Sequence, residues 1–141
     1  MSERIIYGLK SEGTMLPRYS SCEVYNTGRV ILKSGSLLDA SEDKSTYQLI
    51  SKETVHKIER LIDDNSRIFA IKEVEGANDI VITDGSYETL SFSDGQRKNT
   101  LNVYCLDFRE ESPNTPDMNL LLKLHREIEE ILKSCGIDED Y

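Results

Sequence analysis

"SYETLSFSDGQRKNTLNVYCLDF", residues 86–108, is the stretch that decides the fold. Two segments in which apolar and polar residues alternate stand on either side of Asp94-Gly95. Alternation with a period of two is typical of half-buried strands, and Asp-Gly is a preferred pair for the central positions of a type I′ turn. The stretch therefore predicts a β-hairpin with a two-residue turn at Asp94-Gly95.

A second hairpin is predicted at residues 20–34, "SSCEVYNTGRVILKS", where two alternating segments stand on either side of Asn26-Thr27-Gly28. Gly28 is the expected site of positive φ, because glycine adopts that region without a steric cost. The apolar residues of the two strands are expected to face one another across the ladder: Cys22, Val24, Val30 and Leu32.

Two further strands extend the expected sheet. Residues 4–10, "RIIYGLK", alternate and place Ile5, Tyr7 and Leu9 on one face. The segment "TYQLI" at 46–50 is interpreted as another strand. Both segments add to an arrangement that is dominated by hairpins.

The remaining non-helical segments give weaker signals. Residues 35–45 are polar and acidic, so we expect a loop there. The apolar runs at 67–74 and 79–83 are too short for periodicity to classify, but their β-branched residues favour strands.

The first helix is predicted over residues 52–64. Ser51 is a suitable N-cap because its hydroxyl can accept a hydrogen bond from an early helix N–H, and Glu53 complements the positive end of the helix dipole. One apolar stripe is expected to face the core: Val55, Ile58, Leu61 and Ile62.

The second helix is predicted near the C-terminus. Thr115 is the expected N-cap, Pro116 suits the first helical position, and Gly136 is the expected residue just past the end. The acidic segment at 136–141 is expected to fray. The expected buried face of this helix consists of Met118, Leu121, Leu124, Ile128, Ile131 and Leu132.

The order of these elements indicates the fold class. Hairpins dominate, helices are few, and no glycine-rich strand-to-helix turn is present. We therefore expect a single α+β domain over residues 1–141, in which two helices pack on one face of an antiparallel sheet.

Composition and charge restrict the function classes. The chain has 141 residues, of which 38% are hydrophobic and 30% charged, and its net charge is −9. No apolar run approaches the length of a membrane span, and no secretory signal is recognisable, so we expect a soluble cytoplasmic protein that does not bind membranes. The bases are spread among acids, which argues against nucleic acid as a partner.

The potential metal ligands do not form a complete set. Three cysteines, Cys22, Cys105 and Cys135, have no C-x-x-C spacing and are expected to be reduced thiols. His125 and Glu129 stand four residues apart on the second helix, but a transition-metal site needs three or four donors. We therefore interpret them as an exposed helical ion pair, and we expect no metal and no cofactor.

An enzymatic alternative stays open beside a binding role. A small hydrolase would pair His125 or His56 with a carboxylate for general acid–base chemistry. The chain has no nucleophile elbow, P-loop or dinucleotide-binding pattern. We therefore assign no catalytic residue and rank an enzyme behind a binding protein.

The order of elements carries a resemblance. "KSEGTMLPRYSSCEVYNTGRVILKS" (10–34), "SKETVHKIERLID" (51–63) and "LLLKLHREIEEIL" (120–132) resemble a group of small bacterial domains without an assigned function. The organisation is also similar to that of emfourin-like proteins, which inhibit thermolysin-type metalloproteases. The resemblance implies a non-catalytic domain, with inhibition as one form of protein binding. The matching residues are Gly13, Cys22, Val24, Tyr25, Gly28 and Val30.

The segment 14–19, "TMLPRY", is the candidate binding site. Met15 and Leu16 are apolar residues in an expected loop, and they either fold back as a lid on the core or project as a recognition loop. Pro17 would lower the entropic cost of binding, and self-association through the same patch is a third reading. The segment predicts a protein-binding module of unidentified partner, with these site residues: Thr14, Met15, Leu16, Pro17, Arg18 and Tyr19.

Overall fold

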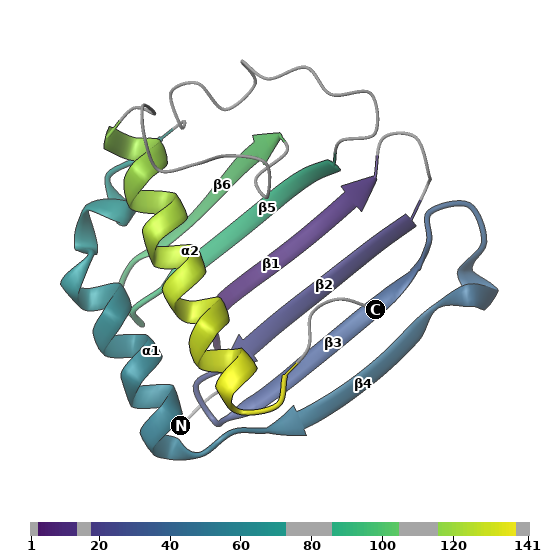
Figure 1. Ribbon diagram of the computed structural model, residues 1–141, viewed down its shortest axis with the longest axis horizontal. Helices are drawn as coiled ribbons and strands as arrows, with labels where there is room; N and C mark the ends of the chain where they lie inside the picture. The colour runs from purple at the N-terminus through teal and green to yellow at the C-terminus, as the bar shows by residue number, and fades with distance from the viewer. Residues whose placement is uncertain (1–2, 14–17, 73–85, 105–115, 138–141) are drawn as a thin grey trace.

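The computed structural model describes residues 3–13, 18–72, 86–104 and 116–137. Figure 1 shows a broad sheet with two helices in front of it. The elements follow one another in this order: β1 (Ile5–Gly13), β2 (Arg18–Tyr25), β3 (Arg29–Ser36), the short 3₁₀ helix η1 (Ala40–Glu42), β4 (Lys44–Leu49), α1 (Lys52–Asp64), the 3₁₀ helix η2 (Ser66–Phe69), β5 (Ser86–Ser93), β6 (Lys98–Tyr104) and α2 (Pro116–Ser134).

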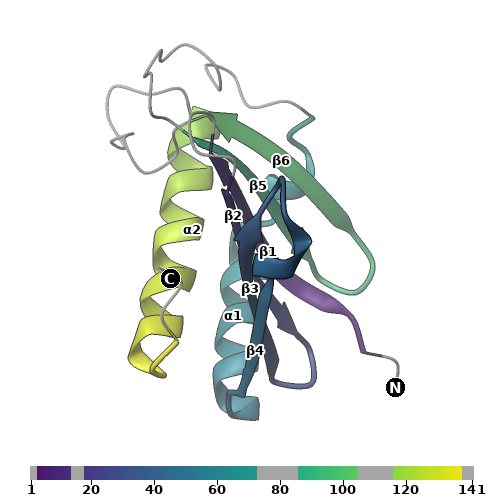
Figure 2. The same ribbon diagram turned by 90° about the vertical axis from the view of Figure 1, so that its right-hand side faces the viewer.

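The described strands form one six-stranded sheet in the order β4-β3-β2-β1-β5-β6. Each neighbouring pair is antiparallel. Both helices lie on the same face, and the edge-on view in Figure 2 shows α2 to the left of the sheet. These observations confirm the expected α+β class. We call the sheet surface opposite the helices the open face.

The β2–β3 hairpin has the predicted register. Val24 lies opposite Val30, and Cys22 lies opposite Leu32. Gly28 has a φ of 95°, and a Cβ atom at this position would lie 2.5 Å from the carbonyl oxygen of Ile50. Gly28 is therefore required both by the turn and by the close passage of the chain after β4.

The β5–β6 hairpin is also confirmed, but its turn lies one residue later than predicted. The Asp94 N–H donates to the Arg97 carbonyl at 3.1 Å, so the two central residues are Gly95 and Gln96. Gly95 has a φ of 93°. The Asp94 carboxylate accepts hydrogen bonds from the N–H groups of Gln96 and Arg97, and this local bonding explains the displacement.

Helix α1 begins and ends as predicted. The Ser51 hydroxyl accepts a hydrogen bond from the Thr54 N–H at 3.2 Å, as an N-cap does. Val55, Ile58 and Ile62 are buried against the sheet, and Leu61 is partly buried beside them.

The end of helix α2 corrects the expectation of a frayed C-terminal segment. The Ile137 N–H donates to the Leu132 carbonyl, and the Gly136 N–H donates to the Lys133 carbonyl, which is the Schellman arrangement. Gly136 has a φ of 82°, and Ile137 is buried. The chain is thus anchored through residue 137. Thr115, the expected N-cap, and residues 138–141 lie outside the described residues.

The first strand differs from its predicted pattern. The pairing of β1 with β2 shifts register between Ile5 and Tyr7. Ile6 and Tyr7 are both buried, whereas the Ile5 side chain lies near Gly8. The predicted face of Ile5, Tyr7 and Leu9 is therefore wrong for Ile5, because a β-bulge reverses the alternation at that point.

Two predicted segments have a different local structure. Residues 66–69 form the 3₁₀ helix η2 and not a strand. The Asn99 amide donates hydrogen bonds to the carbonyls of Ile68 and Ile71, and these bonds hold the turn against β6. Within the expected loop at 35–45 the chain forms η1 and then begins β4. The predicted strand at 79–83 lies outside the described residues.

The core lies between the helices and the sheet. Beyond the predicted residues of α2, Leu122 and His125 are also buried. The largest buried side chains include Tyr7 and Phe92, whose ring centroids are 5.7 Å apart. Burial decreases toward β4, where all six residues are exposed. The helices thus cover the middle and the β6 side of the sheet and leave its β4 side uncovered (Figure 1).

Candidate functional site

The structure describes two of the six residues that the sequence singles out for binding. Thr14, Met15, Leu16 and Pro17 lie outside the described residues. Arg18 and Tyr19 are the first two residues of β2, opposite Ser36 and Gly35 of β3.

Both described residues contact the turn that leads into β4. Arg18 Nη1 lies 3.6 Å from Glu42 Oε2. Tyr19 is hydrogen-bonded to the Asp43 carboxylate. The pKa of Tyr19 is raised above its usual value, mainly by desolvation and to a smaller extent by this carboxylate. Lys10 Nζ lies 6.0 Å from the centre of the Tyr19 ring. The end of the predicted binding loop is therefore joined to the beginning of β4.

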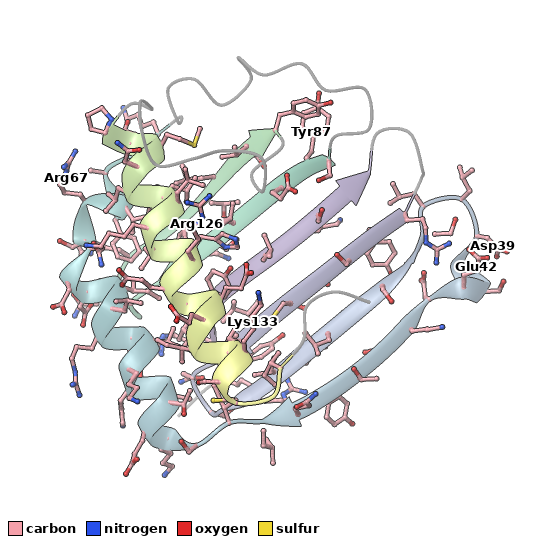
Figure 3. The ribbon with its side chains drawn as sticks, viewed as in Figure 1. Asp39, Glu42, Arg67, Tyr87, Arg126 and Lys133 are labelled. Atoms are coloured by element: carbon pink, nitrogen blue, oxygen red, sulfur yellow. The ribbon has the colours of Figure 1, made fainter. Side chains whose placement is uncertain are left out.

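The turn between β3 and β4 presents apolar side chains on an ordered backbone. Leu38 is 83% exposed, and its N–H donates to the Ser36 hydroxyl at 3.1 Å. The Asp39 carboxylate accepts hydrogen bonds from the backbone and side chain of Ser41, which lower the pKa of Asp39. Figure 3 shows Asp39 and Glu42 at the tip of this turn, far from the helices.

Strand β4 is an exposed edge of the sheet. Its register with β3 places Tyr47 opposite Ile31 and Leu49 opposite Arg29, on the open face. Tyr47 is 69% exposed and Leu49 is 80% exposed. Two large apolar side chains thus stand beside one another, two residues apart, on the outermost strand. We call Lys44–Leu49 the β4 edge.

Among the described strands, the β4 edge pairs with β3 alone, so its outer side faces no other strand. The Ile50 N–H donates to the Gly28 carbonyl at 2.8 Å, so Ile50 pairs toward β3. In an antiparallel ladder, residues alternate between bonding to one side and to the other. Alternation from Ile50 directs the N–H and C=O groups of Ser45, Tyr47 and Leu49 away from β3. The same three residues place their side chains on the open face.

Two cavities lie near this part of the sheet. One, of about 410 Å³, is on the helix side of the sheet and is lined by Arg18, Ser20, Ser34, Glu42, Lys44 and Thr46 among others. The other, of about 480 Å³, is on the open face over Gly8, and its lining includes Lys10, Ser21, Lys33, Ser91 and Lys98. The first cavity joins Arg18, at the end of the predicted binding loop, to β4.

His125 is buried, which overturns the expectation of an exposed ion pair. It is 3% exposed, and its Nδ1 atom lies 2.9 Å from the Tyr7 hydroxyl. Its Nε2 atom lies 2.9 Å from Glu129 Oε2, and Lys133 Nζ lies 3.2 Å from the other oxygen of Glu129. The bond from His125, with help from Lys133, lowers the pKa of Glu129 to about 2.

This buried chain of polar groups connects the sheet to α2. If His125 Nε2–H donates to Glu129, the neutral imidazole accepts from Tyr7 at Nδ1, so both ring nitrogens are satisfied. His125 lines neither of the two cavities described above. The geometry is that of a satisfied core polar group.

The second histidine is at the surface. His56 Nδ1 lies 3.5 Å from Glu59 Oε1 on α1, and its side chain is 68% exposed. Within the described ranges, no group of three or more His, Cys, Asp or Glu side chains is placed to hold a metal ion. Cys22 is a buried thiol and Cys135 an exposed one, and neither forms a disulfide with another described residue.

The sequence did not identify the β4 edge as a site. The segment at 46–50 was expected as a strand, but its alternation gives no information on its position in the sheet. The only indication in the sequence of an apolar binding surface is the placement of Tyr47 and Leu49 on one face of the strand. Such a face is equally typical of a strand that packs against the core.

None of the helices in the described part of the chain is long and apolar enough to span a membrane. A scan against models of protein families gives no match, and a search among curated proteins gives none either.

Proposed function

We propose that this protein is a protein-binding module whose partner adds an extended segment to the sheet along the β4 edge. The observation that carries the proposal is the exposure of all six residues of this edge strand. Strand addition obtains affinity from main-chain hydrogen bonds and specificity from alternate side chains. The outward N–H and C=O groups of Ser45, Tyr47 and Leu49 supply the main-chain hydrogen bonds. The side chains of Tyr47 and Leu49 supply the specificity.

The contrast between the two edges of the sheet supports this choice. Natural proteins protect edge strands with charges, prolines, bulges or a covering segment. At the other edge, Asn99 at the beginning of β6 binds the carbonyls of Ile68 in η2 and of Ile71 just after it, and Arg97 lies 4.6 Å from the centre of the Phe69 ring. The β4 edge carries a single charged residue, Lys44, and no proline.

The segment 14–19 belongs to the same proposed surface. Arg18 and Tyr19 reach Glu42 and Asp43, which directly precede β4. A partner strand on the β4 edge would therefore pass close to these residues at one end. Arg and Tyr are types that contribute strongly to interfaces, so we propose that they contact the partner and that residues 14–17 extend this contact.

The resemblance to emfourin-like inhibitors is compatible with this mode of binding, because a segment added to a sheet edge is one way to hold a protease. The proposed compartment is the cytoplasm, where thiols such as those of Cys22 and Cys135 stay reduced. The hydrolase alternative has no comparable support, since His125 is buried and bonded on both ring nitrogens.

The test is affinity capture from the native cell with mass spectrometry. The chain is compared with a variant that carries Tyr47→Asp and Leu49→Asp, and with Tyr87→Asp as a control. Tyr87 is 53% exposed on the open face, but it lies on β5, away from the β4 edge. We expect the double variant to lose its captured proteins at least tenfold while the control retains them. Equal capture by the double variant would overturn the proposal.

A further inference from the structure

We infer that the partner of the β4 edge is a second copy of this chain, paired antiparallel about a two-fold axis at Tyr47. The inference rests on the proposed function, because it names the occupant of the same edge. It follows from three properties of β4: the symmetry of its outward backbone groups, the sizes of its side chains and the position of its only charge.

The outward backbone groups are symmetric about Tyr47. Ser45 and Leu49 stand two residues before and two residues after it, and all three direct their N–H and C=O groups away from β3. With Tyr47 on the axis, Ser45 of one copy lies opposite Leu49 of the second copy. Every outward N–H then meets an outward C=O, so the pairing leaves none of these groups without a partner.

The side chains are compatible with the same register. Because the two copies pair with odd residues opposite odd residues, their open faces form one continuous surface. Tyr47 meets Tyr47 of the second copy, and the large Leu49 meets the small Ser45. On the helix side, Thr46 meets Gln48 and can hydrogen-bond to it.

The charge pattern favours this register although the chain is acidic. Lys44 is the only charged residue of the β4 edge, and it falls opposite Ile50, at the end of the paired segment. No like charges therefore lie opposite one another within the paired strands. The net charge of −9 on each copy acts at longer range, where salt screens it. Association should therefore become tighter as the salt concentration rises.

Space for a second copy is available beside β4. Figure 1 shows no helix in front of most of β4, and Figure 2 shows β4 at the side that faces the viewer. The helix-side residues Lys44, Thr46 and Gln48 are all exposed, so no described segment covers them. The sheets of two copies can thus join with both helix layers on the same side.

The first experiment is sedimentation of the full chain over a range of concentrations. The chain is expected to form dimers that dissociate on dilution, and Tyr47→Pro should weaken the association at least tenfold. Proline removes the outward N–H of Tyr47 and no bond to β3, so it is compatible with an edge strand. Tyr47→Lys, which keeps the backbone intact and places two charges on the axis, is the second variant, and Leu38→Ser is the control.

The second experiment tests the register by disulfide formation. A hydrogen-bonded antiparallel pair has its Cα atoms about 5.5 Å apart, which suits a disulfide. In a Cys135→Ser background, Tyr47→Cys should give a covalent dimer on mild oxidation. Ser45→Cys and Leu49→Cys should each give little alone but should cross-link when mixed. The Cys135→Ser chain without an added cysteine is the control, and it measures any cross-linking through the remaining native cysteines.

The outcomes separate this inference from the proposed function. A chain that is monomeric at every concentration, while Tyr47→Asp with Leu49→Asp still abolishes capture, overturns the second copy as partner and leaves strand addition in place. A dimer that is unaffected by both Tyr47→Pro and Tyr47→Lys overturns this register. Loss of the dimer in both Tyr47 variants, together with the mixed cross-link, supports it.

Discussion

The Tyr7 hydroxyl lies 2.9 Å from His125 Nδ1, and this contact connects the middle of the sheet to the second helix across 118 residues of sequence. Both groups are buried, so removal of the hydroxyl takes away a hydrogen bond without giving water access. Tyr7→Phe is expected to lower the free energy of unfolding by about 1–2 kcal/mol in urea denaturation. Tyr47→Phe, at an exposed position, is the control and should leave the unfolding curve unchanged. Equal effects of both substitutions would contradict the role of the contact.

Glu129 makes the stability dependent on pH in acid. The folded protein holds the pKa of Glu129 at about 2, against an ordinary value of 4.5, chiefly through the bond from His125. A lowered pKa contributes stability above the ordinary value, and this contribution disappears as pH falls from 4.5 to about 2. The expected loss is about 2 kcal/mol, because the carboxylate is half-buried and solvent screens part of the interaction.

The measurement compares unfolding of the wild type and of Glu129→Gln at neutral pH and near pH 2. The two proteins should differ at neutral pH and converge in acid. Glu130→Gln changes an exposed carboxylate on the same helix and serves as the control. A constant difference between wild type and Glu129→Gln at all pH values would contradict the assignment.

Two glycines with positive φ should respond differently to alanine. Gly28 has a φ of 95°, and a Cβ atom there would meet the Ile50 carbonyl oxygen at 2.5 Å. Gly136 has a φ of 82°, but no atom lies within 4 Å of its Cβ position. We expect Gly28→Ala to cost about 3 kcal/mol and Gly136→Ala about 1 kcal/mol. Thermal unfolding of the two variants measures the difference, and similar costs would show that the Ile50 carbonyl moves away easily.

Asn99 is expected to hold η2 in place. Its amide donates to the carbonyls of Ile68 and Ile71 at 2.8 and 2.6 Å. Asn99→Ala removes both bonds, so the amides of residues 66–71 should exchange with solvent at least tenfold faster, with a cost in stability of about 1–2 kcal/mol. Asn102 lies on the same strand as Asn99, and its side chain makes an exposed hydrogen bond to Thr89 of β5. Asn102→Ala is the control and should leave the exchange rates of the amides at 66–71 unchanged.

The segment 14–19 is tested with Met15→Asp combined with Leu16→Asp. Lost capture with an unchanged melting curve would support a recognition loop. A lowered melting temperature would support a lid on the core, because burial of two charges is costly. A change in molecular mass alone would support self-association through this patch. His56→Gln is the control for the enzymatic alternative and should leave capture intact.

The predictable part of the fold rests on local chemistry. Gly28 between two alternating segments and Ser51 before an amphipathic run each carry their signal within a few residues, and the structure confirms both. The turn at Gly95 was displaced because the Asp94 carboxylate binds two backbone N–H groups that the dipeptide pattern does not consider.

The part that was not predictable depends on residues far apart in sequence. The 3₁₀ helix at 66–69 is held by Asn99, about thirty residues away, so its β-branched residues gave the wrong signal. His125 was expected at the surface because its partner Tyr7 belongs to the first strand. The candidate site also depends on residues far apart in sequence, because β4 is an edge strand only through the order of the strands in the sheet.

Use of the same sheet edge by both copies limits the size of the proposed assembly. In the proposed pairing each copy contributes β4, so neither copy keeps an unpaired β4 edge once the pair has formed. If β4 of one copy instead paired with a different edge of the next copy, each added copy would leave an edge open for another. The product would then be an open fibre. Pairing of β4 with β4 instead closes the interface after one addition, so the same exposed backbone that permits binding gives a finite complex and not a filament.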